Sequence, residues 1–171
     1  YWGRNEYDLR WICERDWVAR RTVMLGSTDL DLVVEGLDTV ADIRWNGETV
    51  ISGQNVHRSY RRSVSNVARV GENEVEIIFR SPVREGAKRQ AEQPFRIPYS
   101  TDNNPIPNGN MLRKVQCDFG WDWNIALAPF GIVGDIRLEP TGKPRFEDIR
   151  VWQDHSPGHV SLRVEAACVW G

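Results

Sequence analysis

The 171-residue sequence has no apolar run near the roughly 18 residues that a membrane-spanning helix needs, so no membrane partner is expected. Its formal net charge is only −2, which provides no basic surface for nucleic acid. The three cysteines, Cys13, Cys117 and Cys168, are too few and too widely spaced for a disulfide framework. We therefore expect reduced, mostly buried thiols and a cytoplasmic or otherwise reducing location.

The short motifs of several enzyme classes are also absent. The sequence contains no GxSxG nucleophile elbow, no phosphate-binding P-loop and no GxGxxG dinucleotide turn. His57 stands in a strand-turn context and is not expected to act as a general base. His155 and His159 lie near Cys168, but this polar segment lacks the further ligands of a closed metal site. We expect no metal, no cofactor and no catalysis by this chain alone.

Helix signals are sparse. One or two turns are predicted over residues 82–93, weakened by Gly86, and another turn over residues 4–10. The dominant period is two residues, as in "DLDLVVEG", "EVEIIF", "GDIRLE" and "VSLRVEAACVW". Between two such runs, Asn46-Gly47 predicts a hairpin, because a type I′ turn needs positive φ at both central residues.

Turn residues separate these short strands at near-regular intervals, and one such break is expected over Gly71, Glu72 and Asn73. This organisation predicts an all-β fold, an antiparallel sandwich or jelly roll.

One connection between the predicted strands differs from the others. Residues 94–111 have no period and hold four prolines and four asparagines, which is typical either of a functional loop or of a surface insertion.

A domain boundary is predicted where Pro140, Gly142 and Pro144 interrupt the strand pattern. A new alternation begins at Phe146, and the remaining residues hold two strands at most. Because an isolated hairpin is only marginally stable, we expect residues 144–171 to begin a second β-domain that this chain does not complete. Both ends of the sequence resemble cuts through a longer protein.

The segment "FGWDWN", residues 119–124, places two of the eight tryptophans around one aspartate in a stretch otherwise typical of β-sheet. An indole offers a flat apolar face to a sugar ring, and a carboxylate accepts two hydroxyl hydrogen bonds. Trp121 and Asp122 are therefore candidates for sugar binding. On chemistry alone, a tryptophan-rich corner packed on the sandwich is the favoured alternative for the same residues.

Several segments together resemble the amino-terminal domain of the β-mannosidases, which belong to the glycoside hydrolase group that also holds β-galactosidases and β-glucuronidases. They are "YWGRNEYDLRWICERDWVARRTVML", "LVVEGLDTVADIRWNGETV", "GENEVEIIFRSP", "LRKVQCDFGWDWN" and "GIVGDIRLE". The resemblance covers nearly the whole chain, and "FGWDW" is the part that indicates the mannosidase branch. It implies a jelly-roll, galactose-binding-like sugar-binding domain over 1–142, without its first strands, and the start of an incomplete immunoglobulin-like sandwich over 144–171.

The resemblance also implies partners and roles. The partners would be a β-mannoside or oligosaccharide and a downstream TIM barrel that carries both catalytic glutamates of a retaining mechanism. Trp121 would form an apolar wall of the sugar subsite and Asp122 would bind hydroxyl groups. Trp123 would pack behind them, while Arg113 and Lys114 would brace the loop.

The sequence departs from the family pattern at two positions, and three other interpretations stand as alternatives. Asn124 follows the second tryptophan where the family has glycine, and Ala19 stands where a tyrosine is common. The alternatives are a free-standing carbohydrate-binding module, a fragment of a related β-glucuronidase or β-galactosidase, and a purely structural sandwich.

Overall fold

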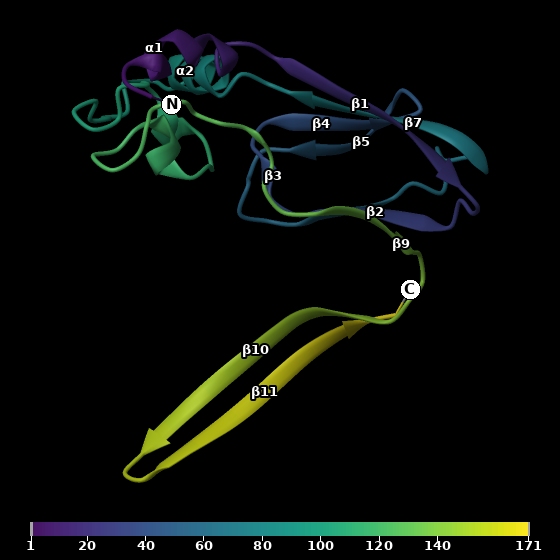
Figure 1. Cartoon of the computed structure of the whole chain (residues 1–171). Coiled ribbons are helices and arrows are strands. Elements are labelled where there is room, and N and C mark those ends of the chain that lie inside the picture. Colours follow the sequence, from purple (N-terminus) through teal and green to yellow (C-terminus); the bar gives the residue numbers. More distant parts are fainter. Residues whose placement is uncertain (1, 171) are drawn as a thin grey trace. The chain divides into compact units, whose positions relative to one another are not determined.

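The computed structural model describes residues 2–170 and divides into two compact units, Tyr1–Glu139 and Pro140–Gly171. The first unit contains two facing sheets (Figure 1). Four strands form an antiparallel sheet in the order β1-β7-β4-β5: β1 Trp17–Leu25, β4 Ala41–Trp45, β5 Glu48–Gly53 and β7 Gly71–Phe79. Three strands form the other sheet in the order β6-β2-β9: β2 Leu30–Val34, β6 Tyr60–Ser63 and β9 Ile136–Pro140. A short pair, β3 Leu37–Asp38 and β8 Gly131–Ile132, completes this all-β fold.

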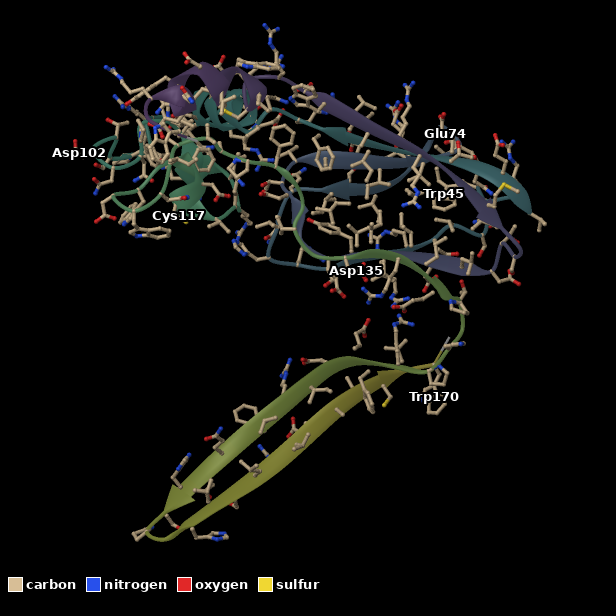
Figure 2. The ribbon with its side chains drawn as sticks, viewed as in Figure 1. Trp45, Glu74, Asp102, Cys117, Asp135 and Trp170 are labelled. Atoms are coloured by element: carbon tan, nitrogen blue, oxygen red, sulfur yellow. The ribbon has the colours of Figure 1, made fainter. Side chains whose placement is uncertain are left out.

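The core between the sheets follows from the two-residue period of the strands. Alternate apolar side chains of each strand point inward, so Leu32, Ile43 and Ile77 are buried together. Trp45 is 1% exposed, and Figure 2 shows its side chain between the two layers. The alternation predicted for β2 and β7 is therefore confirmed.

The hairpin predicted at Asn46-Gly47 is also confirmed. These residues connect β4 to β5 with φ angles of 49° and 90°, and Trp45 pairs with Glu48. The break expected over residues 71–73 is wrong, because β7 begins at Gly71. Asn73 is fully buried there and accepts the indole N–H of Trp45 at 3.0 Å, so its amide stabilises the strand instead of ending it.

Helices are longer than the sequence indicated. Helix α1, Asn5–Leu9, continues into the 3-10 helix η1, Arg10–Ile12, and α2 spans Pro82–Ala91. Helix α2 runs beyond the one or two turns expected, and the Ser81 hydroxyl, which accepts the N–H of Arg84 at 3.1 Å, caps its first turn. Gly86 does not shorten it: a side chain there would lie 2.8 Å from the Asn108 carbonyl oxygen, so this glycine permits close packing.

The helices gather at one end of the sandwich (Figure 1) over a second apolar cluster. Its buried members are Cys13, Ile106, Leu112, Phe119, Ala126 and Ala128. Only Cys13 among the three thiols is buried, since Cys117 is partly exposed and Cys168 exposed, which corrects the expectation of mostly buried thiols. Within residues 2–170, no helix is long and apolar enough to cross a membrane.

The second unit is a two-stranded antiparallel hairpin made of β10, Arg145–Ser156, and β11, His159–Val169. Its register pairs Val151 with Val164 and Ile149 with Ala166, so apolar side chains share one face of the hairpin. The alternation predicted for β11 is confirmed. Because Val151 and Val164 are more than half exposed, the hairpin has no core of its own within the described residues.

Candidate functional site

The segment singled out for sugar binding forms a tight turn at the helical end of the first unit. The 3-10 helix η3, Gln116–Phe119, precedes it, and the strand-like context expected from the sequence is therefore wrong. Trp121 and Asn124 pair across the turn: the Trp121 N–H donates to the Asn124 carbonyl at 3.0 Å, and the Asn124 N–H returns a bond at 3.3 Å. Asp122 and Trp123 lie at the tip.

The three side chains of this tip face solvent. Trp121 is 44% exposed, Trp123 is 70% exposed, and Asp122 is also exposed. Trp121 and Asp122 can therefore meet a ligand from the same short segment. Trp123 was expected to pack behind them, but within this chain it is the more exposed indole, because a tight turn leaves its central residues without a neighbouring layer.

The base of the turn is held by glycine packing against the long loop 94–111. Gly120 has φ +114°, a conformation that side chains rarely adopt. A side chain at Gly120 would lie 2.5 Å from Pro105 and 2.8 Å from the Asn103 carbonyl oxygen. The Ile106 N–H also donates to the Phe119 carbonyl at 3.4 Å. The base of the turn therefore packs against the proline-rich loop.

Asn124, which replaces the family's glycine, fastens the turn to η3. Its side-chain amide donates to the Cys117 carbonyl at 2.9 Å. Asn124 is not among the residues with positive φ, so the turn does not require a glycine at this position. The substitution adds a hydrogen bond to the turn.

We expect Asn124→Gly to lower the free energy of unfolding of the chain by about 1 kcal/mol, because it removes this bond and adds backbone freedom. Urea denaturation followed by tryptophan fluorescence measures the change. Asn124→Asp is the matched variant, since it keeps the shape, replaces the N–H donor with an oxygen and adds a negative charge that faces the Cys117 carbonyl. Wild-type stability in Asn124→Asp would show that the bond contributes nothing.

A buried ion network lies beneath the turn. The ammonium group of Lys114, whose side chain is fully buried, contacts the Asp118 carboxylate in η3 at 2.6 Å and pairs with Asp38 in β3. Burial raises the pKa of Asp38, and the charge of Lys114 opposes that rise. Lys114, which is 76 residues from Asp38 in the sequence, thus joins η3 to β3. Arg113 is exposed, and its backbone carbonyl accepts the Val56 N–H at 3.1 Å.

Helix α1 holds the chain on the other side of the turn. The Glu6 carboxylate accepts the Ala126 N–H at 3.3 Å, and the Arg10 guanidinium donates to the Ala126 carbonyl at 3.2 Å.

Sequence reasoning missed Glu6, Arg10 and Asp38, because each is distant from residues 119–124 in the chain. Gly120 carried a recognisable signal, since a glycine beside bulky aromatics often marks a close backbone approach.

The site has the character of a binding surface. Among residues 2–170, no group of three or more His, Cys, Asp or Glu side chains is placed to hold a metal ion. The exposed indole of Trp121 and the carboxylate of Asp122 can stack on and hydrogen-bond to a polyhydroxylated ligand. The backbone bonds between Trp121 and Asn124 hold both residues on one short turn.

Comparison with known proteins gives the family and the relatives of this chain. Residues 1–134 match the family described as "Glycosyl hydrolase 2 galactose-binding domain-like". A probable β-mannosidase of Caenorhabditis elegans is 34% identical over 149 residues, covering 80% of this chain and 16% of that protein. The β-mannosidase of Bos taurus is 31% identical, covering 81% of this chain and 17% of that protein. The chain thus spans less than a fifth of these two relatives.

Solved structures give the same fold. A β-D-mannosidase from Dictyoglomus thermophilum superposes with a TM-score of 0.85 at 26% identity, covering 98% of this chain and 21% of that chain. A β-D-glucuronidase from the same organism has a TM-score of 0.56 at 11% identity, covering 90% of this chain and 25% of that one. At that identity, the second likeness concerns the fold alone.

Proposed function

This chain belongs to the glycosyl hydrolase 2 galactose-binding domain-like family, and from that membership we propose that it is the sugar-contacting domain of a β-mannosidase. The observation that carries the proposal is the turn at Trp121–Asn124, which exposes an indole and a carboxylate on a fixed base. The names of the relatives, which are β-mannosidases, support a terminal β-mannosyl residue as the sugar.

In this proposal each residue of the turn has a separate task. Trp121 presents a flat apolar face to the pyranose ring, and Asp122 accepts hydrogen bonds from its hydroxyl groups. Lys114 supports the turn without touching the sugar, because its ion pair with Asp118 holds η3 immediately before the turn. Such a fixed geometry is useful because hydrogen bonds to sugar hydroxyls must keep their alignment as the ring distorts during hydrolysis.

The reaction itself belongs to the barrel of the full-length protein. In a retaining mechanism one glutamic acid protonates the leaving oxygen, a second glutamate attacks the anomeric carbon, and water then releases the sugar. Both glutamates lie outside these 171 residues in the proposal. Residues 144–171 would begin the immunoglobulin-like sandwich that connects the two domains.

The test is hydrolysis of para-nitrophenyl β-mannoside by the full-length protein, with the matching β-glucuronide and β-galactoside as competitors. We expect cleavage of the mannoside and none by the 171-residue chain. Cleavage of another glycoside with the mannoside inert would replace the proposal with a sister enzyme. Tight binding of mannose by the 171-residue chain alone, together with a coding sequence that contains no barrel, would indicate a free-standing binding module.

A further inference from the structure

Ala126, just beyond the turn at Trp121–Asn124, is held by two charged side chains from the start of the chain. It is 2% exposed, so both of its backbone polar groups need partners within the protein. The Glu6 carboxylate accepts its N–H at 3.3 Å, and the Arg10 guanidinium donates to its carbonyl at 3.2 Å. We call Glu6 and Arg10 the clamp, because together they satisfy both backbone groups of one residue.

The two side chains of the clamp also hold each other. They are four residues apart on a helical segment, which places them on the same side, and the Arg10 Nη2 lies 3.6 Å from the Glu6 Oε1. This pairing leaves Nε of Arg10 and Oε2 of Glu6 for the backbone of Ala126. The Arg10 guanidinium also lies 4.6 Å from the centre of the Tyr7 ring, which favours the same orientation.

The position of Ala126 matters for the turn because Ala126 packs directly against Gly120, the residue before Trp121. A Cβ atom at Gly120 would lie 3.0 Å from the Cβ atom of Ala126, so no space is left between the two residues. The clamp therefore holds the surface against which the first residues of the turn are placed. A shift of Ala126 would loosen the packing at Gly120.

Three alternate residues anchor the chain as it leaves the turn. The Asn124 side chain donates to the Cys117 carbonyl at 2.9 Å, and the Ala128 N–H donates to the Asp118 carbonyl at 2.7 Å. Both of these anchors lead back to η3, whereas the partners of Ala126 are 116 and 120 residues away in the sequence. The clamp thus fixes the exit of the turn to a separate part of the fold.

We propose that Glu6 and Arg10 are positioning residues of the sugar site, which fix the exit of the turn and thereby align Trp121 and Asp122 with the sugar. This inference rests on the proposed function, because it assigns the clamp to the same site. Alignment has a large effect on rate, since a misplacement of about 1 Å far from the chemistry can cost about a hundredfold. Charged groups suit the task, because their hydrogen bonds are stronger than those between neutral groups.

Steady-state kinetics of the full-length protein with para-nitrophenyl β-mannoside test the proposal. Glu6→Ala and Arg10→Met each remove one half of the clamp, and either should lower kcat/KM by about tenfold and raise KM by about threefold or more. The rise in KM separates misalignment from instability, because a smaller folded fraction lowers kcat and leaves KM unchanged. Glu6→Gln keeps an oxygen that can accept the Ala126 N–H, so it should recover most of the loss seen in Glu6→Ala.

The matched control is Glu85→Ala in α2, which should keep the wild-type kcat/KM. Glu85 and Arg89 form a pair with the same spacing, and their side chains are 22% and 23% exposed, against 20% and 22% for Glu6 and Arg10. Arg89 donates to the Gln54 side chain and not to the segment around the turn.

Two results would overturn the inference and leave the proposed function standing. They are an equal loss in Glu85→Ala, and a wild-type KM in both clamp variants while Asp122→Ala is impaired. Full activity of Asp122→Ala would instead remove the sugar site itself and the role of the clamp with it.

Discussion

Replacing Asp122 with alanine in the full-length protein should lower kcat/KM for a β-mannoside, the proposed substrate, by about a hundredfold or more and leave the Tm unchanged. Each hydrogen bond from a sugar hydroxyl to a carboxylate contributes about 1.5–3 kcal/mol, and a carboxylate can accept two. Stability should be preserved because the exposed side chain of Asp122 makes no hydrogen bond or ion pair within residues 2–170. Steady-state kinetics with para-nitrophenyl β-mannoside and a thermal melt measure both quantities.

The matched control for Asp122→Ala is Asp102→Ala. Asp102 is also an exposed loop aspartate, and the Ser100 hydroxyl donates to it at 3.3 Å, but it lies outside the turn. We expect Asp102→Ala to retain near-normal kcat/KM. Near-normal turnover in Asp122→Ala would remove Asp122 from the proposed sugar subsite, whatever substrate the enzyme takes.

The second large effect is expected from Lys114→Met, which should lower the free energy of unfolding of the chain by about 3–5 kcal/mol. Methionine fills a similar volume but leaves the carboxylate of Asp38, which is 3% exposed, without its cation. Breaking one side of a buried ion pair carries this cost because the remaining charge stays in a poorly solvated place. Urea denaturation of the 171-residue chain measures the difference.

The neighbouring substitution Arg113→Met is the control, because the Arg113 side chain is exposed and changes of that kind stay within about 0.5 kcal/mol. Comparable losses in the two variants would show that the network does not stabilise the fold.

The pH dependence of the Lys114→Met loss follows from the pKa of Asp38. Burial raises that pKa in the folded state, so the Asp38 carboxyl favours folding at low pH, and this contribution is lost as the pH rises through the folded pKa. Removing Lys114 removes the charge that opposes the rise. The loss in free energy of unfolding caused by Lys114→Met should therefore become smaller as the pH falls from 7 toward 5. A loss that grows over this range would contradict the pairing of Lys114 with an ionised Asp38.

The parts of the fold that sequence analysis predicted are those set by neighbouring residues. The two-residue period placed the strands β2, β7 and β11, and the local chemistry of Asn46-Gly47 placed a turn. For the candidate site, the combination of Trp121 with Asp122 was recognisable because both chemistries occur within two residues. Such signals require no knowledge of the tertiary structure.

The features that were missed depend on contacts between distant segments. Lys114 and Asp38 are 76 residues apart, and nothing local marks a lysine that will be fully buried. Likewise, nothing local in residues 116–119 marks the 3-10 helix that forms where Phe119 packs into the second apolar cluster. Tertiary packing decided both cases against the local preference.

The construction of the turn at Trp121–Asn124 has an evolutionary consequence. Its conformation depends on backbone bonds, on Gly120 and on the side chain of Asn124, whereas the side chains of residues 121–123 have no hydrogen-bonding role in it. Mutations at the three tip positions should therefore be nearly neutral for folding while they change what the surface can recognise. A lineage can in this way alter the proposed sugar site without losing a stable protein, because the residues proposed to select the ligand and those that maintain the turn are separate.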